Sequence, residues 1–456
     1  MHDLTKGSIT GHLLRMGLFI AVAMLVQTAY YLVDLYFVSR LGKEAVAGVS
    51  AAGNMMFLAM AVSQAIGVGI TALVSRAIGA GETPKANLIF NQGMGMALII
   101  SALSLIFGYA FGLDAVSRLA ADEATATAAR TYLAAFLPSI AMMFPTVALG
   151  SALRSAGVVQ SPTIVQALSL FLNIALAPVL IAGWGTGHAY GVAGAGWAST
   201  IAVAVGLIAM FAIFPRVQSI MRWERDLVAP RFAEWGRVLY VGLPSAGEFF
   251  LMFIISGVVY WVIRKFGAEA QAGFGIGGRV LQSVMLPAMA ISFSTAPIIG
   301  QNLGAGNAAR VRETFQTAAT ISVTIMIALA LVMHISPSTL TAPFSPDPAV
   351  LENANTYLKI ISWNLVASGL VFTCSGAFQG LGNTTPSLLS SATRLLTFVL
   401  PAVWLEQQPG LTVETFWWLS VASSASQAVI SLALVFRELR RKVGTPTPSD
   451  AAPATP

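Results

Sequence analysis

An acidic side chain in the first long apolar segment has the clearest chemical use in this sequence. Asp34 lies in a segment that runs roughly from residue 13 to residue 39. At helical spacing Gln27, Tyr30, Asp34 and Phe37 share one face, where an amide, a phenol, a carboxylate and a ring converge. An ionised Asp at the centre of a membrane helix costs about 3 kcal/mol, so such residues usually line an ion or substrate path. The pattern predicts a cation or proton site at Asp34 and a substrate cavity lined by Gln27, Tyr30 and Phe37.

Three further ionisable residues lie within predicted spans, and two roles are open for each. Glu248 follows the Gly242-Leu243-Pro244 turn of the seventh span, and it either shares in ion coupling or caps a kinked helix. We assign Arg279 of the eighth span to the substrate cavity, while Arg394 lies in the eleventh. Each Arg alternatively pairs with an acid or with backbone carbonyls between helices. For Asp34 the alternative to coupling is a buried salt bridge or a hydrogen bond between helices.

The composition indicates a polytopic, all-α membrane protein. Of 456 residues, 56% are hydrophobic and 10% are charged, and the mean hydropathy is +0.76, whereas soluble chains carry about 25% charged residues. Hydrophobic windows of about 20 residues predict twelve transmembrane helices. We expect these spans at residues 13–39, 47–75, 88–113, 129–152, 162–184, 191–214, 238–263, 272–299, 314–336, 354–378, 386–404 and 414–436.

The distribution of Lys and Arg predicts the orientation of the chain. An even number of spans places both termini on one side, and most Lys and Arg residues of the loops then fall on that side. By the positive-inside rule, both termini are expected in the cytoplasm of a multi-pass protein of the cell inner membrane. The net charge of +6 belongs largely to these loops, and it indicates contact with anionic membrane lipid, not with nucleic acid. We expect a monomer.

Blocks of sequence recur at an offset of 225 residues. RLGKEAVAG around Gly42 matches KFGAEAQAG around Gly267, and SALRSAGVVQSPT with Gly157 matches GAFQGLGNTTPS with Gly382. Two Gly-Ala-Gly turns match at the same offset. The repeat predicts two six-helix lobes related by a two-fold axis along the membrane normal.

The repeat also sets the expected domains. We expect an N-lobe at residues 1–215, a cytoplasmic linker, partly an interfacial helix, at 216–237, a C-lobe at 238–440 and a disordered tail at 441–456. Asp34 and Glu248 interrupt the repeat, because the same offset brings them to Val259 and Ala23. Since the fold does not need either carboxylate twice, function is the favoured explanation for both.

Several motifs that would indicate an enzyme fail on inspection. Gly273–Gly278, GFGIGG, satisfies the dinucleotide pattern but opens a membrane span with no strand before it. The four His form no H-E-x-x-H motif, and the single Cys374 excludes a thiolate metal site. The two acids of the spans lie in different lobes. We therefore expect no enzyme activity and no cofactor, with H+ or Na+ as a coupling ion.

The chain resembles the multidrug and toxic compound extrusion (MATE) family over nearly its full length. The residues that carry the resemblance are Asp34 before the Leu41-Gly42 turn, the two Gly-Ala-Gly turns, Leu153-Arg154 with Gly157, Gln379–Gly382 with Pro386, Asn173–Pro178, Gly194–Thr200, and Gly242–Pro244 leading to Glu248. Each motif alone is weak, but together, on a repeat of six and six spans, they are specific.

The resemblance implies a V-shaped secondary antiporter of two lobes that exports cationic or amphipathic drugs and toxic metabolites by alternating access. It also implies an N-lobe cation site, to which Asp34, Asn173 and Thr200 belong by matching position, with Na+ possible at these three residues. Ala177 departs from the family, which often has Asp in that place, so Glu248 is the candidate for part of that role. The alternative function is a lipid-linked precursor flippase, whose mark would be basic residues lining the cavity, and Arg279 and Arg394 are the candidates.

Overall fold

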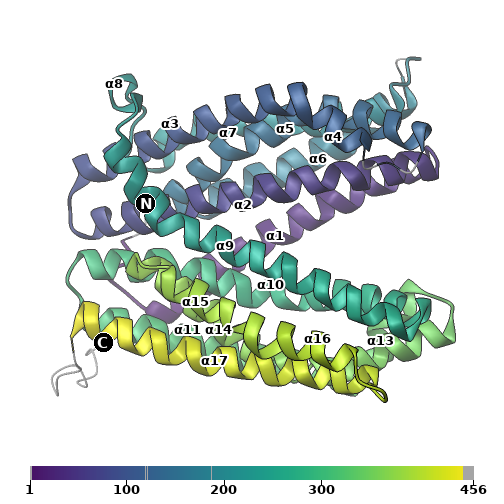
Figure 1. Ribbon diagram of the computed structural model, residues 1–456. Helices are drawn as coiled ribbons and strands as arrows, with labels where there is room; N and C mark the ends of the chain where they lie inside the picture. Colours follow the sequence, from purple (N-terminus) through teal and green to yellow (C-terminus); the bar gives the residue numbers. More distant parts are fainter. Residues whose placement is uncertain (1–2, 119, 121, 186, 445–456) are drawn as a thin grey trace. The chain divides into compact units, whose positions relative to one another are not determined.

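The chain folds into long helices in the computed structural model, which describes residues 3–118, 120, 122–185 and 187–444. Across these residues there are helices and no strand, as Figure 1 shows. Eleven helices are long and apolar enough to cross a membrane, or twelve if the bent pair α13 and α14 is counted as one span. The expected all-α fold and the expected number of spans are therefore confirmed for the described part of the chain.

The helices begin and end close to the expected spans. Their bounds are α1 Ile9–Ser39, α2 Lys43–Gly79, α3 Thr83–Phe107, η1 Gly108–Gly112, α4 Leu113–Arg118, α5 Glu123–Ser155, α6 Gln160–Ala182, α7 Gly191–Val217, α8 Arg225–Val228, α9 Phe232–Ile263, η2 Arg264–Phe266, α10 Ala268–Gly304, α11 Ala308–Ile335, α12 Pro337–Thr341, η3 Ala342–Phe344, α13 Pro348–Ile361, α14 Asn364–Leu381, α15 Thr385–Arg394, η4 Leu395–Val399, α16 Leu400–Glu406 and α17 Val413–Val443. Of the disordered tail expected at residues 441–456, Arg441–Val443 are instead the last residues of α17, and residues 445–456 lie outside the described residues.

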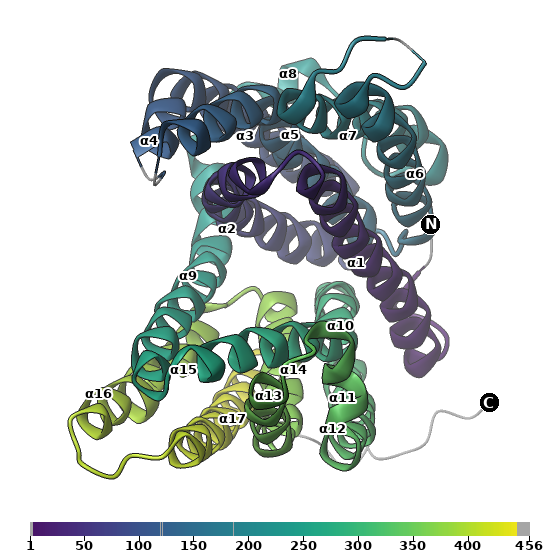
Figure 2. The same cartoon turned by 90° about the vertical axis from the view of Figure 1, so that its right-hand side faces the viewer.

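The helices form two compact units. Unit 1 contains residues 22–243, and unit 2 contains Leu4–Ala21 together with the chain from Pro244 onward. Helices α1 and α9 thus each contribute to both units, and α9 passes from one to the other at Leu243-Pro244. In unit 1, α5 packs against α2, α3 and α7, and α6 packs against α7. In unit 2, α10, α14 and α17 lie side by side, as Figure 2 shows, and α15 packs on α17.

The repeat is visible in the starts of the helices. Helices α2, α3, α5 and α6 begin 225 residues before α10, α11, α13 and α15. Asp122 and Asp347, at the same offset, both cap a helix: Asp122 accepts a hydrogen bond from the amide of Thr125, and Asp347 from that of Ala349. An Asp at this position satisfies a backbone N–H that the helix leaves without a partner.

Matched glycines turn the chain between the helices of both units. Gly42 and Gly267 have φ of 113° and 93°, and Gly157 and Gly382 have φ of 73° and 71°. These values lie in the left-handed region, which glycine adopts without the steric cost that a Cβ brings. The sequence repeat is therefore a repeat of backbone conformation.

The GFGIGG motif is a packing face. A Cβ at Gly273 would lie 2.7 Å from Cβ of Asn353 on α13, and one at Gly277 would collide with the ring of Tyr357. Gly275 and Gly278, on other faces, have open space around them. Glycines four residues apart let two helices approach closely, because no side chain separates their backbones. Gly48 is the counterpart of Gly273, and a Cβ added to it would lie 2.6 Å from the backbone nitrogen of Ala129 on α5.

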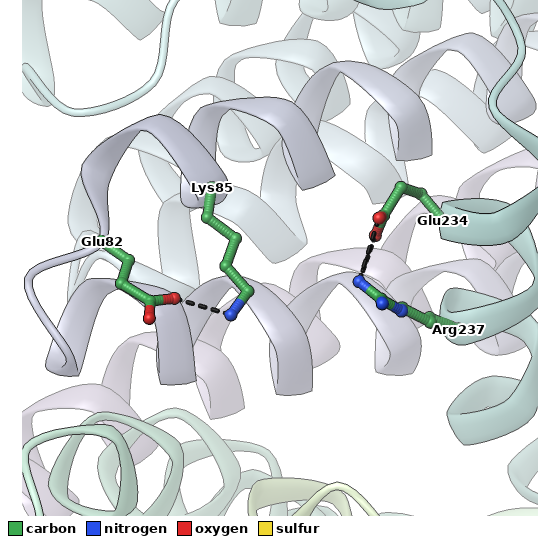
Figure 3. Close-up of polar contacts among 4 residues, drawn as sticks. All are labelled: Glu82, Lys85, Glu234 and Arg237. Carbon is green, nitrogen blue, oxygen red and sulfur yellow. Dashed lines mark hydrogen bonds and ion pairs between the residues drawn. The ribbon is translucent and has the colours of Figure 1, made fainter.

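The segment between the two halves is held by α3. The buried side chains of Asn87, Asn91 and Gln92 bind the backbone of this segment. Gln92, for example, donates to the carbonyl of Ala229 at 2.8 Å and accepts from the amide of Arg231 at 2.8 Å. The described helix in this segment, α8, has only four residues. Two ion pairs lie at the starts of α3 and α9, Lys85 with Glu82 at 2.6 Å and Arg237 with Glu234 at 3.0 Å (Figure 3). Surface pairs of this kind contribute about 0 to 1 kcal/mol each, so the buried amides hold the segment.

Candidate functional site

Asp34 on α1 is buried in unit 1, where its carboxylate lies close to helices α6 and α7. Its side chain is 7% exposed. The hydroxyl of Ser199 on α7 donates to Oδ2 of Asp34 at 2.7 Å. The other carboxylate oxygen, Oδ1, is buried and has no hydrogen-bond partner among the described residues. A carboxylate in this state keeps one oxygen available for a proton or a cation.

Asn173 and Tyr30 complete a polar cluster around Ser199. The amide nitrogen of Asn173, fully buried on α6, donates to the Ser199 hydroxyl at 3.2 Å. The phenol of Tyr30, one turn before Asp34 on α1, donates to the Ser199 carbonyl at 3.2 Å. Oδ1 of Asn173 is also buried without a partner among the described residues. Two oxygen atoms of different helices are thus left free in one cluster, and oxygen ligands are those that hard cations prefer.

No basic side chain of the described residues pairs with Asp34. Its carboxylate accepts the Ser199 hydroxyl directly, and the Asn173 amide joins the cluster through Ser199. A buried carboxylate without a permanent counterion carries a desolvation cost that protonation or a bound cation removes. Of the two alternatives to coupling that the sequence left open for Asp34, the described residues contain the hydrogen bond between helices, from Ser199 on α7, and not the salt bridge.

Thr200 and Phe37 have structural contacts in unit 1. The Thr200 hydroxyl donates to the backbone carbonyl of Ala135 on α5 at 2.7 Å. Phe37 is half-buried and packs against the core of the unit, in edge contact with Tyr36 at 5.4 Å between ring centroids. Gln27 is exposed in this structure. The structure therefore brings Tyr30, Asp34 and Asn173 together, whereas Thr200, Phe37 and Gln27 face other surroundings.

Glu248 lies in a separate polar cluster, in unit 2. Its Oε2 accepts a hydrogen bond from Ser375 on α14 at 3.3 Å, and Oε1 is buried without a partner among the described residues. The kink expected at Pro244 does not end α9, which continues through it from Phe232 to Ile263. Arg279 on α10 is exposed in this structure.

Ser199 is the site residue that sequence reasoning missed. It is placed by small residues of α7: a Cβ at Gly196 would lie 2.7 Å from Cβ of Ala135, and one at Gly194 would touch the carbonyl of Leu180. These close approaches press α7 onto α5 and α6, which turns Ser199 toward Asp34. The available signal was the pair Ser199-Thr200 itself, because adjacent hydroxyls offer two faces of one helix.

The family model MatE matches residues 20–179 and 244–405, one segment in each half of the chain. Among curated proteins, the "FAD transporter" of Shewanella oneidensis is 25% identical over 88% of this chain and 88% of its own length. The "Probable multidrug resistance protein NorM" of Thermotoga maritima is 28% identical over 83% of this chain and 82% of its own.

A solved structure has the same fold. The "Crystal structure of MATE in complex with MaL6" superposes with a TM-score of 0.89 at 22% identity, over 97% of this chain and 99% of that one. At this identity the likeness establishes the fold, which agrees with the helices described above. Because the family model covers well over half of the residues, the chain belongs to the MatE family, the multidrug and toxic compound extrusion transporters, and it is a membrane transporter and not an enzyme.

Proposed function

We propose that this protein exports cationic or amphipathic organic compounds in exchange for H+ or Na+, and that Asp34 carries the coupling ion. The observation that supports this most is the free Oδ1 of a buried Asp34 with no basic partner among the described residues. A charge kept in a membrane interior without compensation is expensive, so it is usually retained for function. Relatives named as multidrug resistance and multidrug export proteins agree with this role.

In the proposed cycle, Asp34 exchanges its ligand with each side of the membrane in turn. Removal from water favours the neutral form of a carboxyl group, so Asp34 takes up a proton or Na+ from outside. Neutralised, it no longer attracts a cationic substrate, which leaves outward while α1 repacks. Loss of the ion toward the cytoplasm restores the charge. For a neutral substrate, one charge moved down 100 mV releases about 2.3 kcal/mol, which sustains about a 50-fold concentration ratio. A monovalent cationic substrate exchanged one for one moves no net charge, so the concentration gradient of H+ or Na+ alone drives its export.

Within the proposed site, the residues have different tasks. Asn173 and Ser199 orient the Asp34 carboxylate through the bonds described above. Thr200 is proposed to support the site indirectly, because its hydroxyl donates to the Ala135 carbonyl on α5 and so helps to fix α7, which carries Ser199. Glu248 of unit 2 is proposed as a second coupling group, because unit 1 has Ala177 at the position where the family often has Asp. Tyr30, Gln27, Phe37 and Arg279 are proposed to line the path of the substrate.

The proposed arrangement in the membrane follows the charges of the loops. Both termini are proposed to be cytoplasmic, in the inner membrane, since most loop Lys and Arg residues lie on their side. The two halves of the repeat are proposed to act as the lobes that alternate access. The active form is proposed to be a monomer in contact with anionic lipid.

Transport by the purified protein tests the function. Proteoliposomes are loaded with a fluorescent cationic dye, and a pH gradient or a Na+ gradient is imposed separately. We expect export driven by one of the two gradients in the unmodified protein, and no gradient-driven export in Asp34→Asn, which keeps the size of the side chain but cannot ionise.

Asp114→Asn is the matched control, because Asp114 is exposed and pairs with Arg130 at the surface. It should export as the unmodified protein does. Gel filtration in detergent verifies that both variants are folded. Normal gradient-driven export by Asp34→Asn would overturn the proposal.

A further inference from the structure

A seam of hydroxyl groups joins α15 and α17 in the interior of unit 2. Ser390 bonds to the carbonyl of Gln427 at 3.2 Å and to the hydroxyl of Ser431 at 2.6 Å. Farther along, Thr397 bonds to Ser423 at 2.8 Å. The proposed cycle at Asp34 uses none of these groups. The seam is polar in a segment where membrane helices usually pack apolar residues.

A single cation, Arg394, lies within this seam among the described residues. It is the last residue of α15 before the π-helical turn η4, and such turns are frequent at functional sites. One of its Nη nitrogens reaches the Ser420 hydroxyl at 3.5 Å, and its guanidinium carbon lies 5.5 Å from the centre of the Phe398 ring. Its Nε is buried and has no hydrogen-bond partner among the described residues.

No carboxylate of the described residues balances this charge. Arg394 forms none of their ion pairs. The titratable group that acts on it electrostatically is the phenol of Tyr357, which carries no charge at neutral pH. The carboxylate of Glu248 lies near Ser387 of α15. Ser387 is seven residues before Arg394, which is about 10 Å along the helix. A buried guanidinium without a counterion is costly unless something supplies the negative charge.

A second unpartnered atom lies on α17, in the stretch of the seam that bonds to α15 and η4. The buried Oγ of Ser424 on α17 has no hydrogen-bond partner among the described residues. Ser424 lies between Ser423, which bonds to Thr397, and Gln427, whose carbonyl accepts from Ser390, so it belongs to the stretch of α17 that packs along residues 390–397. The seam therefore contains a donor Nε–H and a hydroxyl that both lack a hydrogen-bond partner among the described residues.

The repeat relates this seam to the Asp34 cluster. At the offset of 225 residues, Ser424 is the counterpart of Ser199, which binds Asp34. Asp34 itself is replaced by Val259, a buried core residue. Unit 2 therefore keeps the hydroxyl of the unit 1 cluster, loses its negative charge, and has a positive charge nearby.

We infer that the seam around Arg394, Ser420 and Ser424 binds the carboxylate or phosphate group of an organic solute. The guanidinium edge offers Nε–H and Nη–H in one plane, a geometry that fits two oxygens of such a group, and the hydroxyls satisfy the rest. The inference extends the proposed export function to amphipathic compounds that carry an anionic group. One guanidinium matches one oxyanion, in contrast to the basic cluster that a lipid-linked pyrophosphate would need.

The location of Arg394 favours a solute over a lipid headgroup as the source of the anion. Arg394 lies near the middle of the span Thr385–Glu406, about 14 Å from one end and about 18 Å from the other by helical rise. Phosphates of lipid headgroups lie at the ends of such a span, out of reach of its centre.

Equilibrium binding tests the inference without a transport assay. Phenyl phosphate is titrated calorimetrically into the purified protein in a neutral detergent at pH 7, with benzyl alcohol as the uncharged ligand of similar size. We expect binding of phenyl phosphate and little binding of benzyl alcohol. Arg394→Gln should weaken the binding of phenyl phosphate by about tenfold or more, since charge-assisted hydrogen bonds are lost.

Three further variants keep the result interpretable. Arg394→Lys preserves the charge without the planar fork and should lie between the unmodified protein and Arg394→Gln. Ser424→Ala removes the unpartnered hydroxyl of the seam and should weaken the binding of phenyl phosphate by a smaller factor than Arg394→Gln does. Arg264→Gln is the matched control, because Arg264 also lies over a ring, Trp261 at 5.4 Å, but in η2, the short turn that follows α9. Its affinity should equal that of the unmodified protein.

Two outcomes overturn the inference. The first is equal affinity for phenyl phosphate in Arg394→Gln and in the unmodified protein. The second is competition with phenyl phosphate by phosphatidylglycerol, but not phosphatidylcholine, in nanodiscs, which would assign the site to a lipid. Failure of the export function is separate, because Asp34→Asn should still bind phenyl phosphate whether or not Asp34 couples transport.

Discussion

The Ser199 hydroxyl donates a 2.7 Å hydrogen bond to Oδ2 of Asp34 and leaves Oδ1 of the same carboxylate without a partner among the described residues. Ser199 also accepts the amide of Asn173. One side chain of α7 thus connects an acid of α1 with an amide of α6, and it holds the carboxylate in a single orientation.

Replacing Ser199 by Ala should impair coupled export without unfolding the protein. The change leaves both Oδ2 of Asp34 and the amide of Asn173 without their partner, at a cost of about 1 to 3 kcal/mol, which is a factor of about 5 to 150 in the occupancy of the coupling-competent state. Dye export under the driving gradient measures the effect. Ser50→Ala is the control, since Ser50 is exposed and bonds only within its own helix. Equal export by Ser199→Ala and Ser50→Ala would contradict the role of Ser199.

Replacing Glu248 by Gln should lower gradient-driven export but not abolish it. In the proposed function Asp34 carries the principal coupled ion, and Gln keeps a hydrogen-bond acceptor for Ser375 while removing the charge. The steady-state dye gradient at a fixed driving gradient is the quantity to compare. Glu352→Gln, at an exposed residue of α13, should match the unmodified protein. If Glu248→Gln reaches the full dye gradient, Glu248 has no part in coupling.

Substitutions of Gly by Ala in the GFGIGG motif should change the stability of the protein differently on different faces of α10. Gly273→Ala forces a Cβ to 2.7 Å from Asn353 and should destabilise the protein by about 1 to 3 kcal/mol. Gly275→Ala meets nothing within 4 Å and should be neutral or stabilise by up to about 1 kcal/mol, because Ala is the better helix former. Thermal unfolding in detergent measures both. A lower melting temperature for Gly275→Ala than for Gly273→Ala would argue against this packing.

Replacing Asn91 by Ala should release the segment between the two halves. Asn91 is fully buried, donates to the carbonyl of Arg222 at 2.8 Å and accepts from the amide of Glu224 at 3.0 Å. Without these bonds, trypsin should cleave faster after Arg222 and Arg225, and mass spectrometry of the fragments locates the cuts. Asn353→Ala is the control, because the Asn353 amide bonds to Ala349 within its own helix, far from this segment in the sequence, and Ala keeps the Cβ that packs against Gly273. Unchanged cleavage in Asn91→Ala would mean that other contacts hold the segment.

Some features of this protein could be predicted from the sequence because they depend on local pattern. Helices follow runs of apolar residues long enough to span a membrane, and matched glycines such as Gly42 and Gly267 mark turns that need a positive φ. Asp34 stands out for the same reason, since a carboxylate among apolar neighbours is visible in any reading of the chain.

The partners of the site were decided by tertiary structure. Ser199 and Thr200 are adjacent, but successive residues point about 100° apart around a helix, and only the packing of α7 on α5 through Gly196 determines which hydroxyl faces Asp34. For Arg394, the sequence left open whether an acid from another helix would pair with it. The sequence by itself thus determined where the helices lie and which residues are out of place in them, whereas only the rotation and approach of the packed helices decided what each of those residues contacts.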